Sequence, residues 1–142
     1  MRSQRVEYLK TDFVKGFPAF CGIEAGQVDS GFFESFLRPG TTHQQREGFV
    51  HAGLLATMAD HTGGYAGYTL VPESHRILTI EFKINFFRPA TGELIACESR
   101  VINQGKKIII AESELYSKSR DIKKLVSKAT ITLISIPGED FA

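Results

Sequence analysis

Hydrophobic residues recur every three or four positions near the start of the chain. Val6, Leu9 and Phe13 follow this helical period, which predicts an amphipathic helix over about residues 6–18. Pro18 would end that helix, because a proline in a helix interior removes a hydrogen bond and clashes with the preceding turn. We expect the apolar stripe of the helix to pack on a larger element.

A second apolar segment covers residues 26–38 and predicts one strand, which Pro39 stops. The Ser30-Gly31 pair inside it would allow a bend or a bulge. We expect this strand to join a sheet formed mainly by the C-terminal half of the chain.

The C-terminal half alternates between apolar and polar residues, which is typical of strands. In residues 77–87 one face would carry Leu78, Ile80, Phe82, Ile84 and Phe86. Three further strands are expected at residues 94–102, 107–116 and 124–136, separated by turn signals at 88–92, 103–106 and 117–123. Such short connections favour an antiparallel meander of all four strands.

Residues 52–69 predict a long helix of an unusual kind. Few polar residues are available to face solvent, so the helix should be surrounded on most sides. Small residues crowd it, namely Ala52, Gly53, Ala56, Ala59, Gly63, Gly64, Ala66 and Gly67. An interior glycine costs a helix about 1 kcal/mol relative to alanine. The Gly63-Gly64 pair therefore indicates that backbone or ligand comes close there, or that the helix loosens.

The order of these elements predicts an α+β fold. A long apolar helix and an antiparallel sheet of five or six strands must bury each other's apolar faces, and a sheet curled around the helix does this most simply. With 142 residues, the chain has the size of one domain, so we expect a single domain over residues 1–142.

Composition and charge narrow the classes of function. The chain is 42% hydrophobic and 23% charged, as in soluble globular proteins. Its net charge of +1 offers no footprint for a nucleic acid. We find no apolar run long enough to span a membrane and no signal peptide, so a cytoplasmic location is expected. Cys21 and Cys97 should be reduced and mostly buried thiols, and the histidines lack metal-site spacing.

The segment Gly48–Asp60 (GFVHAGLLATMAD) resembles the PaaI-type group of hotdog-fold thioesterases. That group has a glycine, an apolar pair, His-Gly-Gly, and an acidic residue two turns on. Phe86–Ala90 is similar to its aromatic-x-x-Pro-Ala strand end, and Arg100–Lys106 to its strand-turn-strand with Gly-Lys or Gly-Arg. The resemblance covers about residues 20–136.

The resemblance implies the hotdog fold, in which an antiparallel sheet wraps a long helix. It also implies dimers whose sheets join edge to edge, often paired into tetramers, with active sites that use both subunits. The expected activity is hydrolysis of acyl-CoA thioesters without a metal or organic cofactor.

Asp60 is the sharpest candidate for catalysis. It stands among apolar residues, where a charge is costly unless it is paired, hydrated or used. It follows His51 by nine residues, which is ~13 Å along a helix, so a two-fold dimer with antiparallel helices would be needed to bring both ends to one carbon. Asp60 would activate water or attack the thioester, and both routes stay open. The alternative is a carboxylate bonded to Thr57 or Thr62.

The start of the long helix is the second candidate. Helix N-termini expose unpaired N–H groups and a partial positive charge. If the helix begins at 51–53, the N–H of Ala52 or Gly53 points where an oxyanion would be held. The resemblance implies Ala52, in place of the family's first glycine. An ordinary helix start is the alternative. His51 resembles the motif histidine that orders the preceding loop, with an acid–base role as the alternative.

Two further polar residues enter through the resemblance. Gln45 stands where the family has an asparagine that helps hold the water or the carbonyl, and it offers the same amide one methylene further out. Gln44 and Glu47 are possible substitutes. Thr79, ten residues before Pro89, matches a serine or threonine near the attacking group. A plain strand threonine is the alternative.

Binding of CoA calls for basic and polar side chains at its phosphates. The candidates are Arg88, Asn103 and Lys106, each at a strand end or turn, with solvent-facing residues as the alternative. The acyl or pantetheine chain would lie on Tyr65, Tyr68 and Phe86, unless these belong to the core.

Three functions follow in order of preference. The first is acyl-CoA hydrolysis, and the second is a non-catalytic acyl-CoA-binding module. A hotdog dehydratase or hydratase is third, because it needs a catalytic histidine paired with an acid in a differently built loop. His61 does not supply this pair, since it follows Asp60 directly and points about 100° away on a helix.

Overall fold

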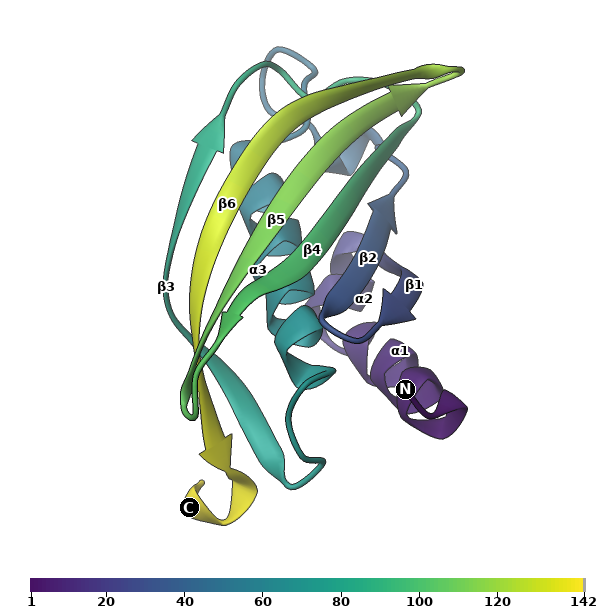
Figure 1. Ribbon diagram of the computed structural model, residues 1–142. Coiled ribbons are helices and arrows are strands. Elements are labelled where there is room, and N and C mark those ends of the chain that lie inside the picture. The colour runs from purple at the N-terminus through teal and green to yellow at the C-terminus, as the bar shows by residue number, and fades with distance from the viewer. Residues whose placement is uncertain (142) are drawn as a thin grey trace.

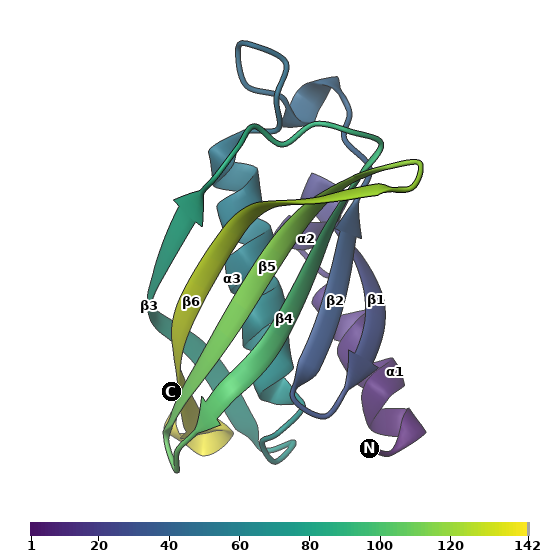
Figure 2. The same cartoon turned by 45° about the horizontal axis from the view of Figure 1, so that its top comes forward.

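The computed structural model of the protein, which describes residues 1–141, contains three α-helices and one six-stranded sheet. The helices are α1 (Ser3–Phe13), α2 (Phe17–Cys21) and α3 (Ala52–Tyr68). The strands are β1 (Glu24–Asp29), β2 (Phe32–Leu37), β3 (His75–Phe86), β4 (Leu94–Gln104), β5 (Ile108–Ser119) and β6 (Ile122–Pro137). The sheet curls around α3, and α1 and α2 lie beside α3 next to β1 (Figures 1 and 2). The predicted α+β hotdog fold is confirmed.

The sheet has the order β1-β2-β4-β5-β6-β3, and every neighbouring pair is antiparallel. The predicted meander of four strands is therefore wrong for β3, which pairs with β6 and not with β4. The segment after β3 crosses the end of the sheet, where the carbonyl of Ala90 accepts a hydrogen bond from the N–H of Val50. This crossing places β3 at the edge of the sheet next to β6, where it contacts α3.

The predicted strands at 107–116 and 124–136 are longer than expected. β5 and β6 together reduce the expected turn at 117–123 to Arg120-Asp121. Arg120 adopts a left-handed φ of 54° there. The polar residues on both sides belong to the ladder, because strands that extend into solvent can carry polar residues on both faces.

The predicted N-terminal helix at 6–18 is wrong at its C-terminal end. α1 stops at Phe13, and Gly16 takes a left-handed φ of 68° before a new helix, α2, begins. Pro18 lies in the first turn of α2, where its missing N–H costs nothing. Leu9 and Phe13 are buried as expected, whereas Phe17 is 61% exposed.

The predicted single strand at 26–38 is also wrong, because it consists of the end of β1 and all of β2. Ser30-Gly31 forms the turn between them, with Asp29 opposite Phe32. Gly31 has a φ of 71°, a conformation that glycine adopts without strain. Ser30 and Gly31, which were predicted to bend a single strand, therefore form a turn that reverses the chain between two strands.

α3 confirms the predicted central helix at 52–69. A Cβ added to Gly63 would lie 3.0 Å from Ile131, and one added to Gly67 would lie 3.0 Å from Leu133. Both glycines therefore let β6 approach the helix closely. Around Gly64, in contrast, an added Cβ would meet nothing within 4 Å, so this glycine faces open space.

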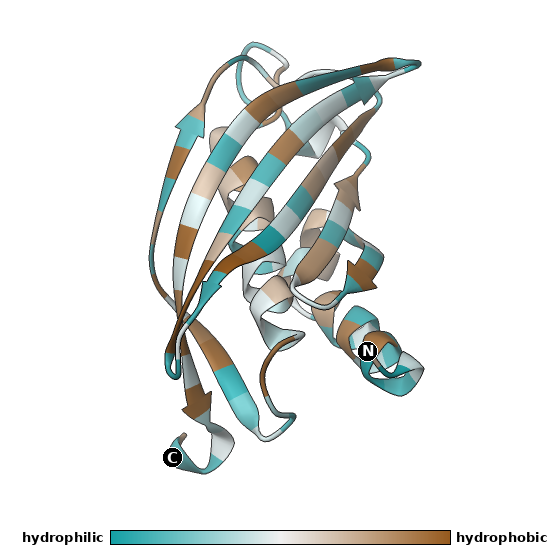
Figure 3. Ribbon diagram, in the orientation of Figure 1, coloured by the Kyte–Doolittle hydropathy of each residue, from teal (hydrophilic) through white to brown (hydrophobic). Residues whose placement is uncertain are grey.

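β3 does not keep one apolar face as predicted. Its ladder with β6 skips Ile80, which lies in a β-bulge between Thr79 and Glu81. Directly opposed residues share a face, so odd-numbered residues face α3 before the bulge and even-numbered residues face it afterwards. Leu78 consequently lies on the outer face of the sheet, apart from Phe86. Figure 3 shows the mixture of hydrophobic and hydrophilic segments along the strands.

Two smaller expectations concern the cysteines and membrane spans within residues 1–141. Cys97 is buried, Cys21 is half-buried, and neither forms a disulfide, as predicted. None of the described helices has the length and hydrophobicity needed to cross a bilayer.

Candidate active site

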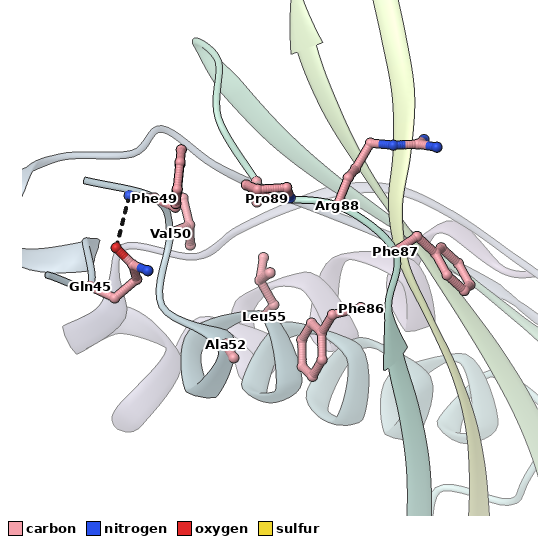
Figure 4. Close-up of a pocket in the computed structure, with 10 residues that line it drawn as sticks. Gln45, Phe49, Val50, Ala52, Leu55, Phe86, Phe87, Arg88 and Pro89 are labelled. Atoms are coloured by element: carbon pink, nitrogen blue, oxygen red, sulfur yellow. Dashed lines mark hydrogen bonds between the residues drawn. The ribbon is translucent and has the colours of Figure 1, made fainter. Parts of the chain in front are cut away.

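The groove between α3 and β3 holds most of the candidate residues. The helix and the strand run antiparallel, so that Phe86 lies near Ala52 and Thr79 lies near Asp60. One cavity of about 430 Å³, here called the N-terminal cleft, is lined by Gln45, Phe49, Val50, Ala52, Leu55, Phe86, Phe87, Arg88, Pro89 and Ala90 (Figure 4). A second of about 190 Å³, the Asp60 hollow, is lined by Asp60, His61, Gly64, Tyr65, Tyr68, Ile77 and Thr79.

Asp60 is half-buried in α3 and accepts one hydrogen bond from β3. The hydroxyl of Thr79 donates to Asp60 Oδ1 over 2.6 Å. Within residues 1–141 no donor reaches Oδ2, so one carboxylate oxygen stays open to the hollow. The alternative partners are engaged elsewhere. Thr57 donates to the carbonyl of Gly53, and Thr62 pairs with Ser35.

At the start of α3, the two predicted oxyanion donors differ in whether their N–H groups are already hydrogen-bonded. His51 is the N-cap, and its Nδ1 accepts the N–H of Gly53 over 2.8 Å. The carbonyl of His51 accepts the N–H groups of Leu54 and Leu55. The N–H of Ala52 has no acceptor among residues 1–141 and lies at the N-terminal cleft. Ala52 is therefore the available donor and Gly53 is not.

His51 forms hydrogen bonds both to the start of the helix and to the preceding loop. Besides capping, it donates its own N–H to the carbonyl of His43 over 2.9 Å. A ring nitrogen that accepts a hydrogen bond carries no proton, so neutral His51 holds its proton on Nε2. The imidazole thus acts on the first helical turn, and the main-chain N–H of His51 binds the loop.

Gln45 turns its amide nitrogen toward the N-terminal cleft. Its Oε1 accepts the N–H groups of Glu47 and Phe49, which identifies the oxygen side of the amide (Figure 4). Two donors are thereby left at the cleft, and a carbonyl or a water molecule would accept from them. Gln44 forms a bridge with Val50. Neither Gln44 nor Glu47 lines the cleft.

The predicted CoA ligands do not come together in one chain. Arg88 lines the N-terminal cleft, but its guanidinium donates to the carbonyl of Leu125 and points away from Ala52 (Figure 4). Asn103 and Lys106 lie at the opposite end of the sheet, beside the β4–β5 turn (Figure 1). The span of β4 between the two ends is roughly 30 Å, at about 3.3 Å per residue.

The two tyrosines of α3 differ in what they present to the Asp60 hollow. The hydroxyl of Tyr65 donates to Asp12 over 2.6 Å, and burial raises the pKa of Tyr65. Its ring packs between Phe13 and Phe33, so Tyr65 belongs mainly to the core. Tyr68 is half-buried and forms the end of the hollow.

His61 has the structural position expected from its place beside Asp60. Its Nε2 donates to the carbonyl of Phe13 over 2.8 Å, and its ring packs on Phe13 and Tyr65. Burial lowers the pKa of His61, which favours the neutral ring. The hydrogen bond to Phe13 and the nearby carboxylates act against this shift.

Sequence reasoning missed the apolar walls of the N-terminal cleft. Phe49, Leu55 and Phe87 line it, each next to a residue that the motifs had singled out. The sequence carried a signal for two of these residues. Phe49 and Phe87 are large apolar residues that lie beside turn residues and outside any helix or strand.

Comparisons with known proteins identify the family and the fold. The sequence profile of the thioesterase superfamily matches residues 47–123. A protein of Halobacterium salinarum named as an esterase is 36% identical over 102 residues, which cover 68% of this chain and 67% of that protein. A thioesterase family protein from Silicibacter pomeroyi has a TM-score of 0.90 at 28% identity, covering 94% of this chain and 99% of the other. The PaaI protein of the phenylacetic acid degradation operon of E. coli has a TM-score of 0.82 at 19% identity, covering 95% and 93%, and shares the fold.

Proposed function

This chain belongs to the thioesterase superfamily, and from that premise we propose that it hydrolyses acyl-CoA thioesters to the free acid and CoA. The proposal depends on one observation. Two unfilled groups of the kinds that this reaction needs, the Ala52 N–H and Asp60 Oδ2, belong to residues that line two separate hollows between α3 and β3, which together are called the groove.

In the proposed reaction the thioester carbonyl oxygen lies at the Ala52 N–H and the Gln45 amide. Asp60 takes a proton from water as the water oxygen adds to the carbonyl carbon, and the N–H stabilises the oxyanion. The tetrahedral intermediate then collapses, the C–S bond breaks, and the proton passes to the CoA sulfur. Direct attack by Asp60 uses the same oxygen, Oδ2. The carboxylate adds to the carbonyl carbon, the C–S bond breaks, CoA leaves as a thiolate that takes a proton from solvent, and water hydrolyses the resulting acyl-enzyme anhydride. Thr79 orients the carboxylate in both routes.

One chain cannot place both groups on one substrate. Ala52 and Asp60 lie ~12 Å apart along α3 at ~1.5 Å per residue. A second copy related by a two-fold axis would bring its own Asp60 to the first copy's Ala52. We therefore propose a homodimer with two shared active sites.

The free edge of β3 supports a dimer of this kind. β3 is an edge strand of twelve residues that carries large apolar side chains in the open. Ile80 is 55% exposed, Phe82 39% and Phe86 45%. Such an edge is a template for pairing with another strand and is aggregation-prone when left bare. Pairing of two β3 strands would cover it.

Replacing Ile80 with aspartate is expected to yield a monomer that has lost thioesterase activity, because a charge on the edge strand blocks pairing. Ile80 is already exposed in the single chain, so the fold should persist. Size-exclusion chromatography and the rate of CoA release are the measurements. Ile122→Asp is the matched control, since Ile122 is 58% exposed at the β5–β6 turn. An active Ile80→Asp monomer would refute the shared site.

The N-terminal cleft is proposed to receive the pantetheine arm or the acyl chain, because its walls are mostly apolar. Arg88 is the preferred phosphate ligand because it borders the cleft. Its guanidinium would exchange the hydrogen bond to the Leu125 carbonyl for one to a phosphate. Asn103 and Lys106 would reach the same CoA only from a partner subunit, given their place at the far end of the sheet.

A non-catalytic acyl-CoA-binding module remains the second candidate. The departures at Ala52 and Gln45 from the resembled motif favour it, because both residues line the proposed reaction site.

Incubation with a panel of acyl-CoAs and a thiol reagent distinguishes the two functions. We expect continuous release of free CoA with at least one acyl group, because the groove supplies both a donor and a base. Isothermal titration with the same panel measures binding in parallel. Saturable binding of an acyl-CoA without thiol release from any member would select the module and reject hydrolysis.

A further inference from the structure

Behind Asp60, on the side of α3 that faces the sheet, lies a group of buried polar side chains. Its members are Ser35 on β2, Thr62 on α3, Cys97 and Ser99 on β4, and Ser113 on β5. Each has no exposed surface. Buried polar groups in a core are costly unless they are hydrogen-bonded, and we call this set the hydroxyl cluster.

The hydroxyl cluster is hydrogen-bonded to the helix immediately before Asp60. Ser113 Oγ donates to the carbonyl of Ala59 over 2.7 Å, and Cys97 Sγ donates to the carbonyl of Met58 over 3.7 Å. Each carbonyl has a second lone pair for its helical partner. The sheet therefore holds the two residues that precede Asp60 by their main chain.

The hydrogen bonds that link Ser99, Ser113 and Ala59 run in one direction. Ser113 gives its only proton to Ala59, so in the 2.6 Å contact between Ser99 and Ser113 it is Ser99 that donates. Successive donations of this kind strengthen one another. Burial raises the pKa of Cys97 to about 11, so its thiol keeps the proton that it donates.

Gly63 makes this contact possible. A Cβ on Gly63 would stand 3.3 Å from Ser113 Oγ and 3.0 Å from Ile131. The missing side chain lets the helix approach β5 closely enough for Ser113 to reach Ala59. The glycine that weakens the helix thus allows a polar contact with the sheet.

We infer that Ser113 is a positioning residue for Asp60. On the proposed function, the reaction requires Asp60 at a defined place relative to Thr79 on β3 and to a thioester held at a helix start. Thr79 on β3 and Ser113 on β5 belong to the same sheet. The Ser113–Ala59 hydrogen bond therefore fixes the position and rotation of α3 relative to β3, whose Thr79 orients the Asp60 carboxylate. Ser99 donates a hydrogen bond to Ser113 and so helps to hold the Ser113 hydroxyl in place.

Ser113→Ala is expected to lower kcat about tenfold with KM nearly unchanged, because a small shift of a reacting group costs rate more than binding. The matched control is Ser127→Ala. Ser127 is equally buried and donates over 2.8 Å to a main-chain carbonyl, that of Asn85 in β3, but its hydroxyl forms no hydrogen bond with α3. This control should lose stability to a similar degree and keep its kcat.

The decisive measurement repeats both substitutions in an Asp60→Asn background. A residue that acts through the carboxylate has no further effect on the residual rate there, whereas general loosening of the fold lowers that rate by the same factor in both backgrounds. Equal kcat for Ser113→Ala and Ser127→Ala, or a tenfold loss that persists in the Asp60→Asn background, overturns the positioning role alone. Full activity of Asp60→Asn would exclude Asp60 from the reaction, and absence of thiol release by the unmodified protein would overturn the proposed function itself, so the failures are distinguishable.

Discussion

Asp60→Asn is expected to lower kcat at least ~100-fold, the usual scale for a positioned acid–base group. Asparagine keeps the shape of aspartate and can still accept the hydrogen bond that Thr79 donates. It cannot take a proton from water or form an acyl anhydride. The loss should therefore appear in turnover of acyl-CoA, with a thermal unfolding midpoint close to that of the unmodified protein.

Asp12→Asn provides the matched control for this experiment. Asp12 also accepts one hydroxyl hydrogen bond of 2.6 Å, from Tyr65, but it lies outside the groove residues that face β3. The same chemical change there should leave turnover nearly intact. An Asp60→Asn protein that is folded and fully active on acyl-CoA would exclude Asp60 as base and as nucleophile.

The residues near Asp60 show why the sequence predicted this part of the molecule well. α3 is so poor in polar residues that its surroundings could be inferred from composition, and its limits follow from the glycine-rich pattern. Local pattern is informative here because one side of the helix, which includes Met58, Ala59 and Ala66, is fully packed. Thr79 came from a resemblance, and the structure places it in contact with Asp60.

β3 shows where the same approach fails. Its alternation predicts one apolar face, but the bulge at Ile80 and the pairing with β6 are decided by residues more than forty positions away. Its large exposed side chains, such as Ile80, stay uncovered within residues 1–141, and strand pairing in the proposed dimer would cover them. At Gly16, a short connection broke a helix whose hydrophobic spacing continued.

The choice between Ala52 and Gly53 came from the resemblance, because the helical pattern alone does not distinguish them. Both N–H groups stand at the helix start, and only the rotamer of His51 decides which of them is capped. Capping by an imidazole nitrogen depends on the side-chain conformation, which the spacing of residues in the sequence does not predict. It leaves the Ala52 N–H as a group that can be removed without disturbing any hydrogen bond within residues 1–141.

Ala52→Pro is expected to abolish this donor and lower kcat by about 10²–10³, the range found for loss of one oxyanion-hole donor. Ala52 is the first residue of α3, a position where proline is favoured because its N–H has no helical partner. His51 already has φ −61° and ψ 135°, the extended conformation required before a proline. The fold should therefore persist. Ala52→Ser, which keeps the N–H, is the control and should retain most activity.

Mixed dimers of Ala52→Pro and Asp60→Asn chains then test whether one site draws on two subunits. Co-expression with two different tags and tandem purification would isolate them. In the proposed arrangement, the Asp60→Asn chain supplies an intact Ala52 N–H and the Ala52→Pro chain supplies an intact Asp60, so one of the two sites is whole. Activity should return to about half that of the unmodified dimer, because a two-fold dimer contains two equivalent sites. If each chain formed its own site, every site would carry a defect, and the mixed dimer would be as inactive as its parents.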